Sequence, residues 1–498
     1  MINGAERMRR EMLIRVVRDF MCPPQEEQSV VSSQQLDEQT GAKNSSLLTS
    51  HSSLPLAARI DRIPLEIRPK ESAPSRCCIY HDRAVIKYGL QAMMGLDYHD
   101  ETDELAPLSG YLQNVLQSDA LPEVPLTVCE AGCNGCPDSR IYVTSNCQGC
   151  FARPCTFSCP KQAITVINQR ATVDYSKCIK CGKCIQVCPF NAIVKTTVPC
   201  EEACPVGAIH KNEKGVAEID FTKCIFCGKC FAKCPFGAVM ERSHLLKVLY
   251  AIKRGKNVVA MIAPSAQPQF PGGLEKLFTA VLKAGFSSVM EVALGAEMTT
   301  QHEAKEFVEK MSEGQKLMTT SCCPAYVQLV KKHLPSFEQF VSTTPSPMKY
   351  AGQIVKEKEP EAVTVFIGPC IAKRHEALSD SNIDFVLTFE ELGAILAGMK
   401  IDVMSQDPAQ LERPAAATAR NFMKSCGVTD AVLTELADAV KKPDGEDGFK
   451  LKTEFIDGID KKTVPKLKMF AGPKSDVNFL EVMACCGGCI NGPCSLVK

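Results

Sequence analysis

The chain has 498 residues, with 57 basic and 57 acidic side chains, 45% hydrophobic residues and 28 cysteines. This balanced charge argues against nucleic acid or an anionic membrane as partner, and no apolar run approaches the roughly 18 residues of a spanning helix. The length indicates two to four domains. Because the chain is long and its cysteines cluster in CxxC runs, they indicate metal binding in a reducing compartment, the cytoplasm, rather than a disulfide scaffold.

The amino-terminal part looks peripheral. Residues 8–19 are basic and amphipathic, which predicts a docking helix, with an organelle-targeting segment as the alternative. Residues 25–55 are rich in Ser, Gln, Thr and Glu and predict a disordered insert. Order is expected to resume near Arg76, followed by helices over 85–94 and 105–116.

Three early cysteines, Cys22, Cys77 and Cys78, have no CxxC partner nearby. We interpret them as structural or incidental thiols rather than metal ligands.

The next region concentrates the cysteines, with 17 of them in the 106 residues from Cys129 to Cys234. Two runs, Cys178–Cys188 and Cys224–Cys234, have the spacing C-x2-C-x2-C-x3-C-P of bacterial ferredoxins, in which three cysteines hold one [4Fe–4S] cluster and the fourth serves another. Zinc sites would need longer central spacers. Short β-prone segments at 163–167 and 217–220 lie between the runs, so a compact ferredoxin-like domain is expected.

Two further runs are modified copies of the same unit, and a Cys-Pro-x-x-Ala-Ile/Val pattern recurs four times, which indicates duplication. The region resembles multi-cluster ferredoxin-like subunits, whose neighbouring motifs exchange their fourth ligand. That resemblance implies four sets: Cys147, Cys150, Cys155 and Cys188; Cys178, Cys181, Cys184 and Cys159; Cys224, Cys227, Cys230 and Cys204; and Cys200 and Cys234 with Cys133 and Cys136. The alternative pairs the two intact runs with each other and leaves one further cluster. Two to four clusters are therefore expected.

From about residue 246 onward, strand-like runs at 258–262 and 362–367 alternate with amphipathic helices at 273–284 and 299–311. This alternation predicts an α/β domain with largely parallel sheet, whose ligand-bearing loops gather at the carboxyl ends of the strands. Residues 441–449 predict a polar surface loop.

The fold class expected for the whole chain is thus multidomain α+β and α/β. The expected boundaries are an amino-terminal extension at 1–75, a helical segment at 76–128, a ferredoxin-like cluster domain at 129–245 and an α/β catalytic domain at 246–498.

Three more cysteine motifs follow in the α/β domain: Thr320–Pro324 (TSCCP), Gly368–Glu376 (GPCIAKRHE) and Met483–Cys489 (MACCGGC). Their residues and order resemble the three signature motifs of the [FeFe]-hydrogenases, most closely the group B branch. The resemblance covers all but the insert near 25–55. It implies an iron hydrogenase catalytic domain with parallel sheets.

The resemblance implies that Cys323, Cys370, Cys485 and Cys489 hold the [4Fe–4S] part of the H-cluster, with Cys489 bridging to a di-iron subsite that carries CO, cyanide and an azadithiolate. Cys322 matches the proton-transfer thiol of the family; a buried thiol beside a ligand is the alternative.

Further roles also follow from the resemblance. Lys373 matches the residue that hydrogen-bonds a cyanide, and the alternative is a surface salt bridge with Glu376. Met483 is expected to line the di-iron pocket. Glu303, Glu306 and Ser342 fall where the family places its proton relay, although two carboxylates on a helix are often a solvated face.

Three departures from the family pattern surround this site: Gly368 stands for a usual methionine, Ala325-Tyr326 lacks a usual tryptophan, and Gly492-Pro493-Cys494 replaces a glycine-rich tail. Cys486 and Cys494 have no assigned role.

The expected activity is reversible reduction of protons to H₂, with electrons from a ferredoxin or similar carrier and with maturation proteins as further partners. No Gly-rich dinucleotide fingerprint is evident, which argues against direct use of NAD(P)H. Two alternatives remain open: a hydrogenase-like iron–sulfur assembly protein without a di-iron subsite, and an H₂ sensor without significant turnover.

Overall fold

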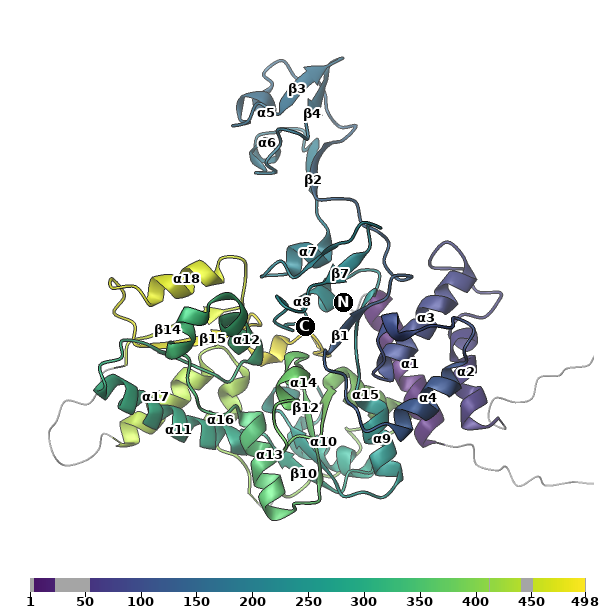
Figure 1. Ribbon diagram of the computed structural model, residues 1–498, viewed down its shortest axis with the longest axis vertical. Helices are drawn as coiled ribbons and strands as arrows, with labels where there is room; N and C mark the ends of the chain where they lie inside the picture. Colours follow the sequence, from purple (N-terminus) through teal and green to yellow (C-terminus); the bar gives the residue numbers. More distant parts are fainter. Residues whose placement is uncertain (1–3, 23–53, 412, 440–450, 498) are drawn as a thin grey trace, which may run out of the picture.

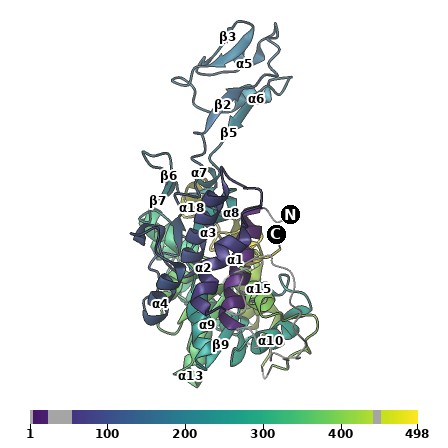
Figure 2. The same cartoon turned by 90° about the vertical axis from the view of Figure 1, so that its right-hand side faces the viewer.

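The computed structural model describes residues 4–22, 54–411, 413–439 and 451–497. It shows a broad body from which a narrow arm projects (Figures 1 and 2). The expected insert at 25–55, apart from its last two residues, and the expected loop at 441–449 lie outside the described residues. Within them, no helix is long and apolar enough to cross a membrane.

Four helices from the amino-terminal part pack on one flank of the body (Figure 1). They are α1 (Gly4–Met21), α2 (Leu56–Ile67), α3 (Ile79–Met93) and α4 (Leu108–Gln117), with a short 3-10 turn, η2 (Tyr98–Asp100), between the last two. The helices expected at 8–19, 85–94 and 105–116 are thus confirmed.

The expectation that the first 75 residues are peripheral was wrong. Leu13, Val16, Val17 and Phe20 repeat at helical spacing and are 0–2% exposed, because this stripe of α1 packs against α15 (Phe389–Gly398). Order also resumes earlier than expected, since α2 begins twenty residues before Arg76.

The arm is the outer half of the cysteine-rich region. Its two antiparallel pairs are β2 (Arg140–Val143) with β5 (Ile193–Thr196) and β3 (Ile164–Ile167) with β4 (Arg170–Val173), accompanied by α5 (Pro154–Phe157) and α6 (Lys183–Gln186). The inner half repeats this plan against the body. It comprises β1 (Leu126–Val128), α7 (Pro199–Ala203), β6 (Ile209–Lys211), β7 (Ala217–Ile219), α8 (Lys229–Lys233) and β8 (Val239–Glu241), with β1 paired to β8 and β6 to β7.

The repeated Cys-Pro-x-x-Ala pattern has a local structural cause. In three copies the alanine backbone N–H donates to the sulfur of the cysteine four residues earlier, at 3.2–3.4 Å for Cys159, Cys188 and Cys204. The turn therefore points each sulfur inward and leads directly into a short strand. The duplication inferred from sequence is visible as a repeated fold.

The α/β part contains two all-parallel sheets. The first has the order β10-β9-β12-β13, from β9 (Val258–Ile262), β10 (Ser288–Glu291), β12 (Val363–Gly368) and β13 (Phe385–Thr388). The second has the order β11-β15-β14, from β11 (Met318–Thr319), β14 (Thr453–Asp457) and β15 (Phe479–Met483). The expected parallel α/β fold is confirmed, including the strands expected at 258–262 and 362–367.

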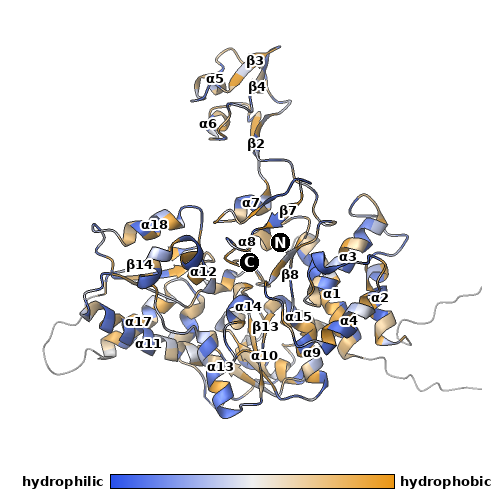
Figure 3. Ribbon diagram, in the orientation of Figure 1, coloured by the Kyte–Doolittle hydropathy of each residue, from blue (hydrophilic) through white to orange (hydrophobic). Residues whose placement is uncertain are grey.

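Helices surround both sheets, and hydrophobic colouring concentrates on the central strands while the outward helix faces are hydrophilic (Figure 3). Every residue of β9 and β15 is buried. Burial on both faces explains why β9 is a continuous apolar run, whereas β15 also buries Glu481, whose carboxylate accepts hydrogen bonds from Cys426 and Thr429. The helices are α9 (Leu245–Lys253), α10 (Gly273–Lys283), α11 (Ala293–Ser312), α12 (Pro324–His333), α13 (Pro347–Lys358), α14 (Ala372–Ala377), α15, α16 (Ala417–Arg420), α17 (Gly427–Ala439) and α18 (Thr463–Phe470), with 3-10 turns η3 (Pro264–Ala266), η4 (Pro335–Phe340), η5 (Asn421–Met423) and η6 (Cys489–Asn491).

Candidate functional site

The three cysteine motifs of the α/β part follow the carboxyl ends of three strands that belong to two different sheets. Cys322 and Cys323 follow β11, Cys370 follows β12, and Cys485 follows β15. All three loops meet at one apolar cavity of about 90 Å³ between the sheets. Among the side chains that line it are Cys322, Cys323, Cys370, Lys373, Met483, Cys485 and Cys489.

Four of these thiols share an environment that opposes their ionisation. Burial, followed by repulsion from one another, raises the pKa of Cys370 to about 11 and that of Cys489 to about 12, and raises that of Cys485 well above 9. Burial also raises the pKa of Cys323. Four thiolates can coexist here only if a cation compensates them, and a soft iron–sulfur centre is the group that this donor set fits.

Glycines in the last cysteine loop are required by close backbone contacts. Gly488 has φ +89°, and a Cβ there would lie 2.4 Å from the Met423 carbonyl oxygen. A Cβ on Gly492 would lie 2.6 Å from the Pro369 carbonyl oxygen. The loop can thus pass over both neighbouring segments only with glycine at these positions.

Cys322 lines the cavity beside Cys323. Its pKa is raised well above 9 by burial first, then by the nearby charges of Glu303 and Cys323. It is therefore held as a neutral thiol, a group that can carry a proton at the edge of the cavity.

Lys373 has the expected ion-pair partner, Glu376, but it is buried beside the cavity. Its Nζ donates to Glu376 at 2.6 Å, so the expected ion pair exists, but only 8% of the residue is exposed and it lines the cavity. The same Nζ donates to the Ser346 hydroxyl at 2.9 Å. The ammonium group is therefore fixed at the cavity wall and is not on the surface.

Two carboxylates on α11 have opposite electrostatic environments. Glu303 is 0% exposed and accepts from the Ser321 backbone at 3.2 Å, and burial raises its pKa to about 8. Burial also acts on Glu306, but hydrogen bonds from Lys310, Ser342 and Thr343 hold its pKa at about 2. The solvated-face interpretation is wrong for Glu303.

Ser342 is hydrogen-bonded to one of these carboxylates and lies near the other. Its hydroxyl donates to Glu306 at 2.6 Å, and its proximity lowers the pKa of Glu303, whose buried Oε2 has no hydrogen-bond partner among the described residues. The structure thus places Glu303, Glu306 and Ser342 close together, with Glu303 near Cys322.

The upstream cysteines gather in sets of four. Cys159, Cys178, Cys181 and Cys184 line one small cavity in the arm, and Cys133, Cys136, Cys200 and Cys234 line another at its base. Cys204 acts electrostatically on Cys224, Cys227 and Cys230, which form a third set. Cys147, Cys155 and Cys188 lie in the apolar core of the arm, which they share with Cys159, Cys178 and Cys184, and Cys150 acts electrostatically on Cys155.

This grouping is the one in which neighbouring motifs exchange their fourth cysteine. The two intact runs do not pair with each other, because Cys234 lies with Cys136 and Cys200. Cys129 is left over as a fully buried thiol that accepts from the Gly132 N–H. In the described part of the chain, no group of Cys, His, Asp and Glu side chains is arranged to hold a single metal ion.

The third set adjoins the main cavity directly. Cys227 lines that cavity, and its charge also acts on Cys485. A Cβ on the neighbouring Gly228, which has φ +71°, would lie 2.8 Å from Pro493. The inner cysteine set and the carboxyl-terminal tail are therefore in van der Waals contact.

Comparison with known proteins decides the family. Residues 256–493 match the iron only hydrogenase large subunit, C-terminal domain; residues 171–194 match a 4Fe-4S binding domain; and residues 194–245 match the LdpA Fe-S cluster-binding domain. The periplasmic [Fe] hydrogenase large subunit of Nitratidesulfovibrio vulgaris is 33% identical over 373 residues, which are 64% of this chain and 85% of that protein. The chain belongs to the iron-only hydrogenase family.

Other relatives show that members of this family differ in their named activities. Iron hydrogenase 1 of Clostridium pasteurianum is 30% identical over 392 residues, covering 67% of this chain but only 66% of that protein. A probable cytosolic Fe-S cluster assembly factor of Drosophila erecta is 27% identical over 255 residues, covering 42% of this chain and 54% of that protein. The relatives therefore include both hydrogenases and iron–sulfur cluster assembly factors, so membership of the family does not by itself decide between these two activities.

The departures of this chain from the family pattern have structural counterparts around the cavity. At Gly368, a Cβ would lie 2.6 Å from the ring of Phe366, which itself lines the cavity, so a phenylalanine occupies space beside the missing methionine side chain. Tyr326, in place of tryptophan, is fully buried and hydrogen-bonds Thr319 at 2.7 Å.

A buried ion network, for which no role was expected from the sequence, ties the cysteine domain to this site. Arg374 follows Lys373 on α14, is 2% exposed, and bonds Glu241 of β8 at 2.9 Å and Glu391 of α15 at 2.7–2.8 Å. Burial raises the pKa of Glu241 to about 7 despite that arginine. The third departure, Cys494, donates its thiol to Glu241 at 3.5 Å.

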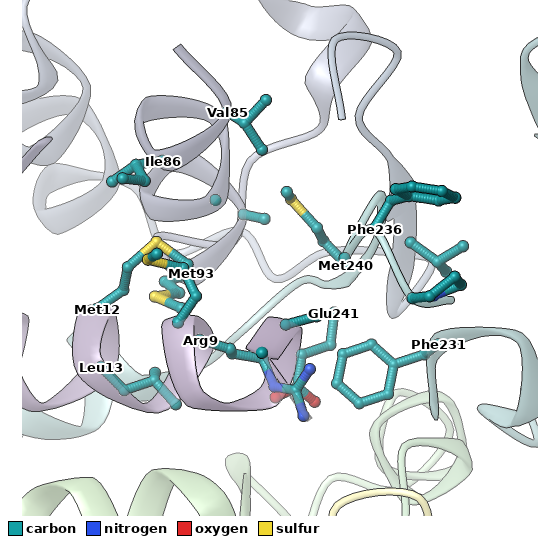
Figure 4. A pocket seen from close by; sticks show the side chains of 18 of the residues that line it. Arg9, Met12, Leu13, Val85, Ile86, Met93, Phe231, Phe236, Met240 and Glu241 are labelled. Carbon is teal, nitrogen blue, oxygen red and sulfur yellow. The ribbon is translucent and has the colours of Figure 1, made fainter. Parts of the chain in front are cut away.

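The same network reaches the amino-terminal helix. Arg9 bonds Glu390 at 2.6 and 2.9 Å and lies 4.2 Å from the ring centroid of Phe231, which follows Cys230. Figure 4 shows Arg9, Phe231 and Glu241 together at one side of a second cavity, of about 290 Å³, between α1, α3 and the cysteine domain. Helix α1 is thus part of the scaffold of the site.

Replacing Arg374 by methionine is expected to destabilise the cluster-loaded chain by about 3–5 kcal/mol, because two buried carboxylates would lose their cation. Arg413→Met is the matched control, since Arg413 pairs with Glu297 at 2.8 Å but its side chain is 75% exposed. It should cost less than about 1 kcal/mol. Thermal unfolding of both variants measures the difference, and equal midpoints would contradict a structural role for the network.

Proposed function

We propose that the chain is an [FeFe]-hydrogenase that catalyses 2H⁺ + 2e⁻ ⇌ H₂. The observation that carries this proposal is one cavity in which four ligand-type thiols, the additional neutral thiol Cys322 and the fixed ammonium of Lys373 converge beside an inner four-cysteine set. A cluster carrier would need the four ligands, but it would need neither a proton-carrying thiol nor a cation at the cavity wall.

In this proposal Cys323, Cys370, Cys485 and Cys489 would hold the [4Fe–4S] part of an H-cluster, and Cys489 would be the residue through which the di-iron subsite is attached. When bound, that group supplies the redox metal at which protons and electrons combine. Lys373 would donate a hydrogen bond to a cyanide, and Met483 would shape the apolar wall. Because a chain cannot encode CO, cyanide or azadithiolate, maturation proteins are proposed partners.

Protons would reach the cavity through Glu306, Ser342 and Glu303. Glu306, held as a carboxylate beside Lys310 at 2.8 Å, is the outer member, and Ser342 passes the proton inward. Glu303, whose pKa of about 8 keeps it protonated near neutrality, then faces Cys322. An outer group that is charged and an inner group that is neutral suit a path from solvent into a dry site.

Electrons would enter through the arm. The four upstream cysteine sets are proposed to hold four [4Fe–4S] clusters in a row that ends at Cys227, beside the main cavity. Adjacent clusters fixed in protein can pass electrons without moving their ligands.

The arm also has the surface of a docking site. Residues 137–197 contain eight basic and two acidic side chains, in a chain whose net charge is zero. The fully exposed Phe151 and the 85% exposed Phe157 lie near the outer cysteines. Negatively charged clusters bound inside the arm would offset part of this positive charge, but the basic side chains on the surface of the arm would remain. An acidic carrier of the ferredoxin type in the cytoplasm is therefore the proposed electron partner.

A second candidate function comes from the relatives that are cluster assembly factors. Such a protein would use the same four thiols without a di-iron subsite. An H₂ sensor would keep the subsite but not turn over significantly.

Loading the iron–sulfur-reconstituted chain with a synthetic di-iron complex that carries CO, cyanide and azadithiolate separates these functions. After desalting, a hydrogenase should show infrared bands of bound CO and cyanide and should evolve H₂ from reduced methyl viologen. Absence of bands, with full iron–sulfur content, would favour the assembly function. Bands without turnover would favour the sensor.

Cys322→Ala in the loaded enzyme is expected to keep the infrared bands and lower turnover at least about 100-fold, because it removes the positioned proton carrier. Glu303→Gln should act in the same direction, since an amide cannot exchange the proton. Cys22→Ala, at an exposed thiol that does not line the cavity, is the control. Normal turnover in Cys322→Ala would remove this thiol from the proton path.

A further inference from the structure

Two adjacent cysteines outside the cluster sets, Cys77 and Cys78, form a dithiol site at the start of α3. The Cys77 sulfur lies 3.9 Å from the Cys78 sulfur and donates to it. The same Cys77 sulfur lies 3.1 Å from Nδ1 of His81. Cys77 is exposed and Cys78 is half-buried, so a small molecule can reach both.

Cys78 has the environment of an attacking thiolate. It is the N-cap of a helix of 15 residues, and its sulfur accepts the backbone N–H of His81 at 3.4 Å. That bond is the main cause of the lowered pKa of Cys78, and the side chain of Cys77 lowers it further. A helix N-terminus and a neighbouring thiol donor are the features that favour a thiolate over a thiol.

Cys77 has the environment of a second thiol with its own base. His81 Nε2 lies 2.6 Å from the carbonyl oxygen of Ala131, which can only accept, so Nε2 carries the ring hydrogen. The lone pair of Nδ1 then faces the Cys77 sulfur. Desolvation, followed by the bond to Cys78, raises the pKa of Cys77, which keeps it protonated until the base takes its proton.

The charged groups near the two thiols do not prevent Cys78 from ionising. The carboxylate of Asp82 faces the site and opposes ionisation of Cys78, but it is occupied by Ser75 and by ion pairs with Arg68 and Arg76. The thiol pair, the histidine and the helix terminus thus form a complete set of attacking thiolate, resolving thiol and base.

We propose that Cys77 and Cys78 are a redox-active dithiol that exchanges with the disulfide of a small thiol compound. In the first step the Cys78 thiolate attacks one sulfur of the disulfide RSSR, forming a mixed disulfide and releasing one RS⁻. In the second step Cys77 gives its proton to His81 Nδ1 and attacks the Cys78 sulfur, releasing the second RS⁻. The dithiol loses two electrons, RSSR gains them, and the two protons leave with two RSH.

This activity is separate from the proposed hydrogenase chemistry, because it uses no cluster ligand. The dithiol site nevertheless lies close to one of the upstream cysteine sets. Ala131, whose carbonyl oxygen accepts from His81, precedes Cys133 of that set by two residues.

The test uses the full chain with its clusters reconstituted and oxidised glutathione as the probe. Mass spectrometry of the digested protein is expected to show an internal disulfide in the peptide containing both cysteines. Cys77→Ser should stop at a glutathione adduct on Cys78, and Cys78→Ser should react no faster than an ordinary thiol. Iron content identifies any variant that has failed to fold.

Cys22 provides the comparison within the same chain, because it is exposed, follows the carboxyl end of α1 and donates to the carbonyl oxygen of Gly398 at 3.9 Å. Alkylation by limiting iodoacetamide at pH 7 should be about tenfold faster at Cys78, because the thiolate is the reacting form and the helix N-terminus favours the thiolate of Cys78. His81→Gln should leave the first step and slow the second. Equal alkylation rates at Cys78 and Cys22, or an unchanged product in Cys77→Ser, would overturn the proposal.

Discussion

Negative charge on buried sulfur is the constraint on which the rest of this structure depends. In the main cavity and the inner set, burial raises the thiol pKa of Cys485 and Cys230 well above 9, and neighbouring thiolates raise it further. The interior therefore cannot hold these groups as thiolates alone, and a bound iron–sulfur centre both compensates their charge and holds their loops together. Folding of these regions and loading of the clusters are, on this account, one process.

The fold brings the buried cysteines together around one centre because the loops that carry them follow strands whose carboxyl ends meet. Parallel strands from two sheets deliver their carboxyl-terminal loops to one cavity, so residues as distant in sequence as Cys323 and Cys485 become neighbours. Arg374 then fixes the distance between this cavity and the cysteine domain, because it bonds carboxylates from β8 and α15 at once. A fixed distance is what one-electron transfer between centres requires, and a rigid buried ion pair supplies it better than a mobile loop.

Local patterns in the sequence predicted much of the fold and of the site. Cysteine spacing within a loop determines which three sulfurs face one another, so the runs at 178–188 and 224–234 could be interpreted directly. The buried strands β9 and β12 were predictable because strands covered on both faces are continuous apolar runs. The exchange of fourth cysteines came from resemblance, since spacing alone also allowed the direct pairing of the two runs.

What the sequence could not show depends on contacts across long separations. Helix α1 looked peripheral because its stripe of Leu13 and Val17 packs on a helix almost 400 residues away. The pairing of Arg374 with Glu241 has no local signal, since isolated charged residues are usually at the surface. The ring of Phe366 occupies the space beside Gly368. This contact also depends on packing, so the three-residue motif around Cys370 does not predict it.

The central claim is that five sets of four cysteines hold iron in a row that ends at the main cavity. Diffraction from the reconstituted chain at the iron absorption edge tests it most directly, because anomalous peaks locate iron without reference to the protein. The account predicts five separate iron centres, one within each set, with the centre of the Cys204, Cys224, Cys227 and Cys230 set next to that of the cavity. No iron between Cys133, Cys136, Cys200 and Cys234, or a centre shared by the two intact runs, would contradict it.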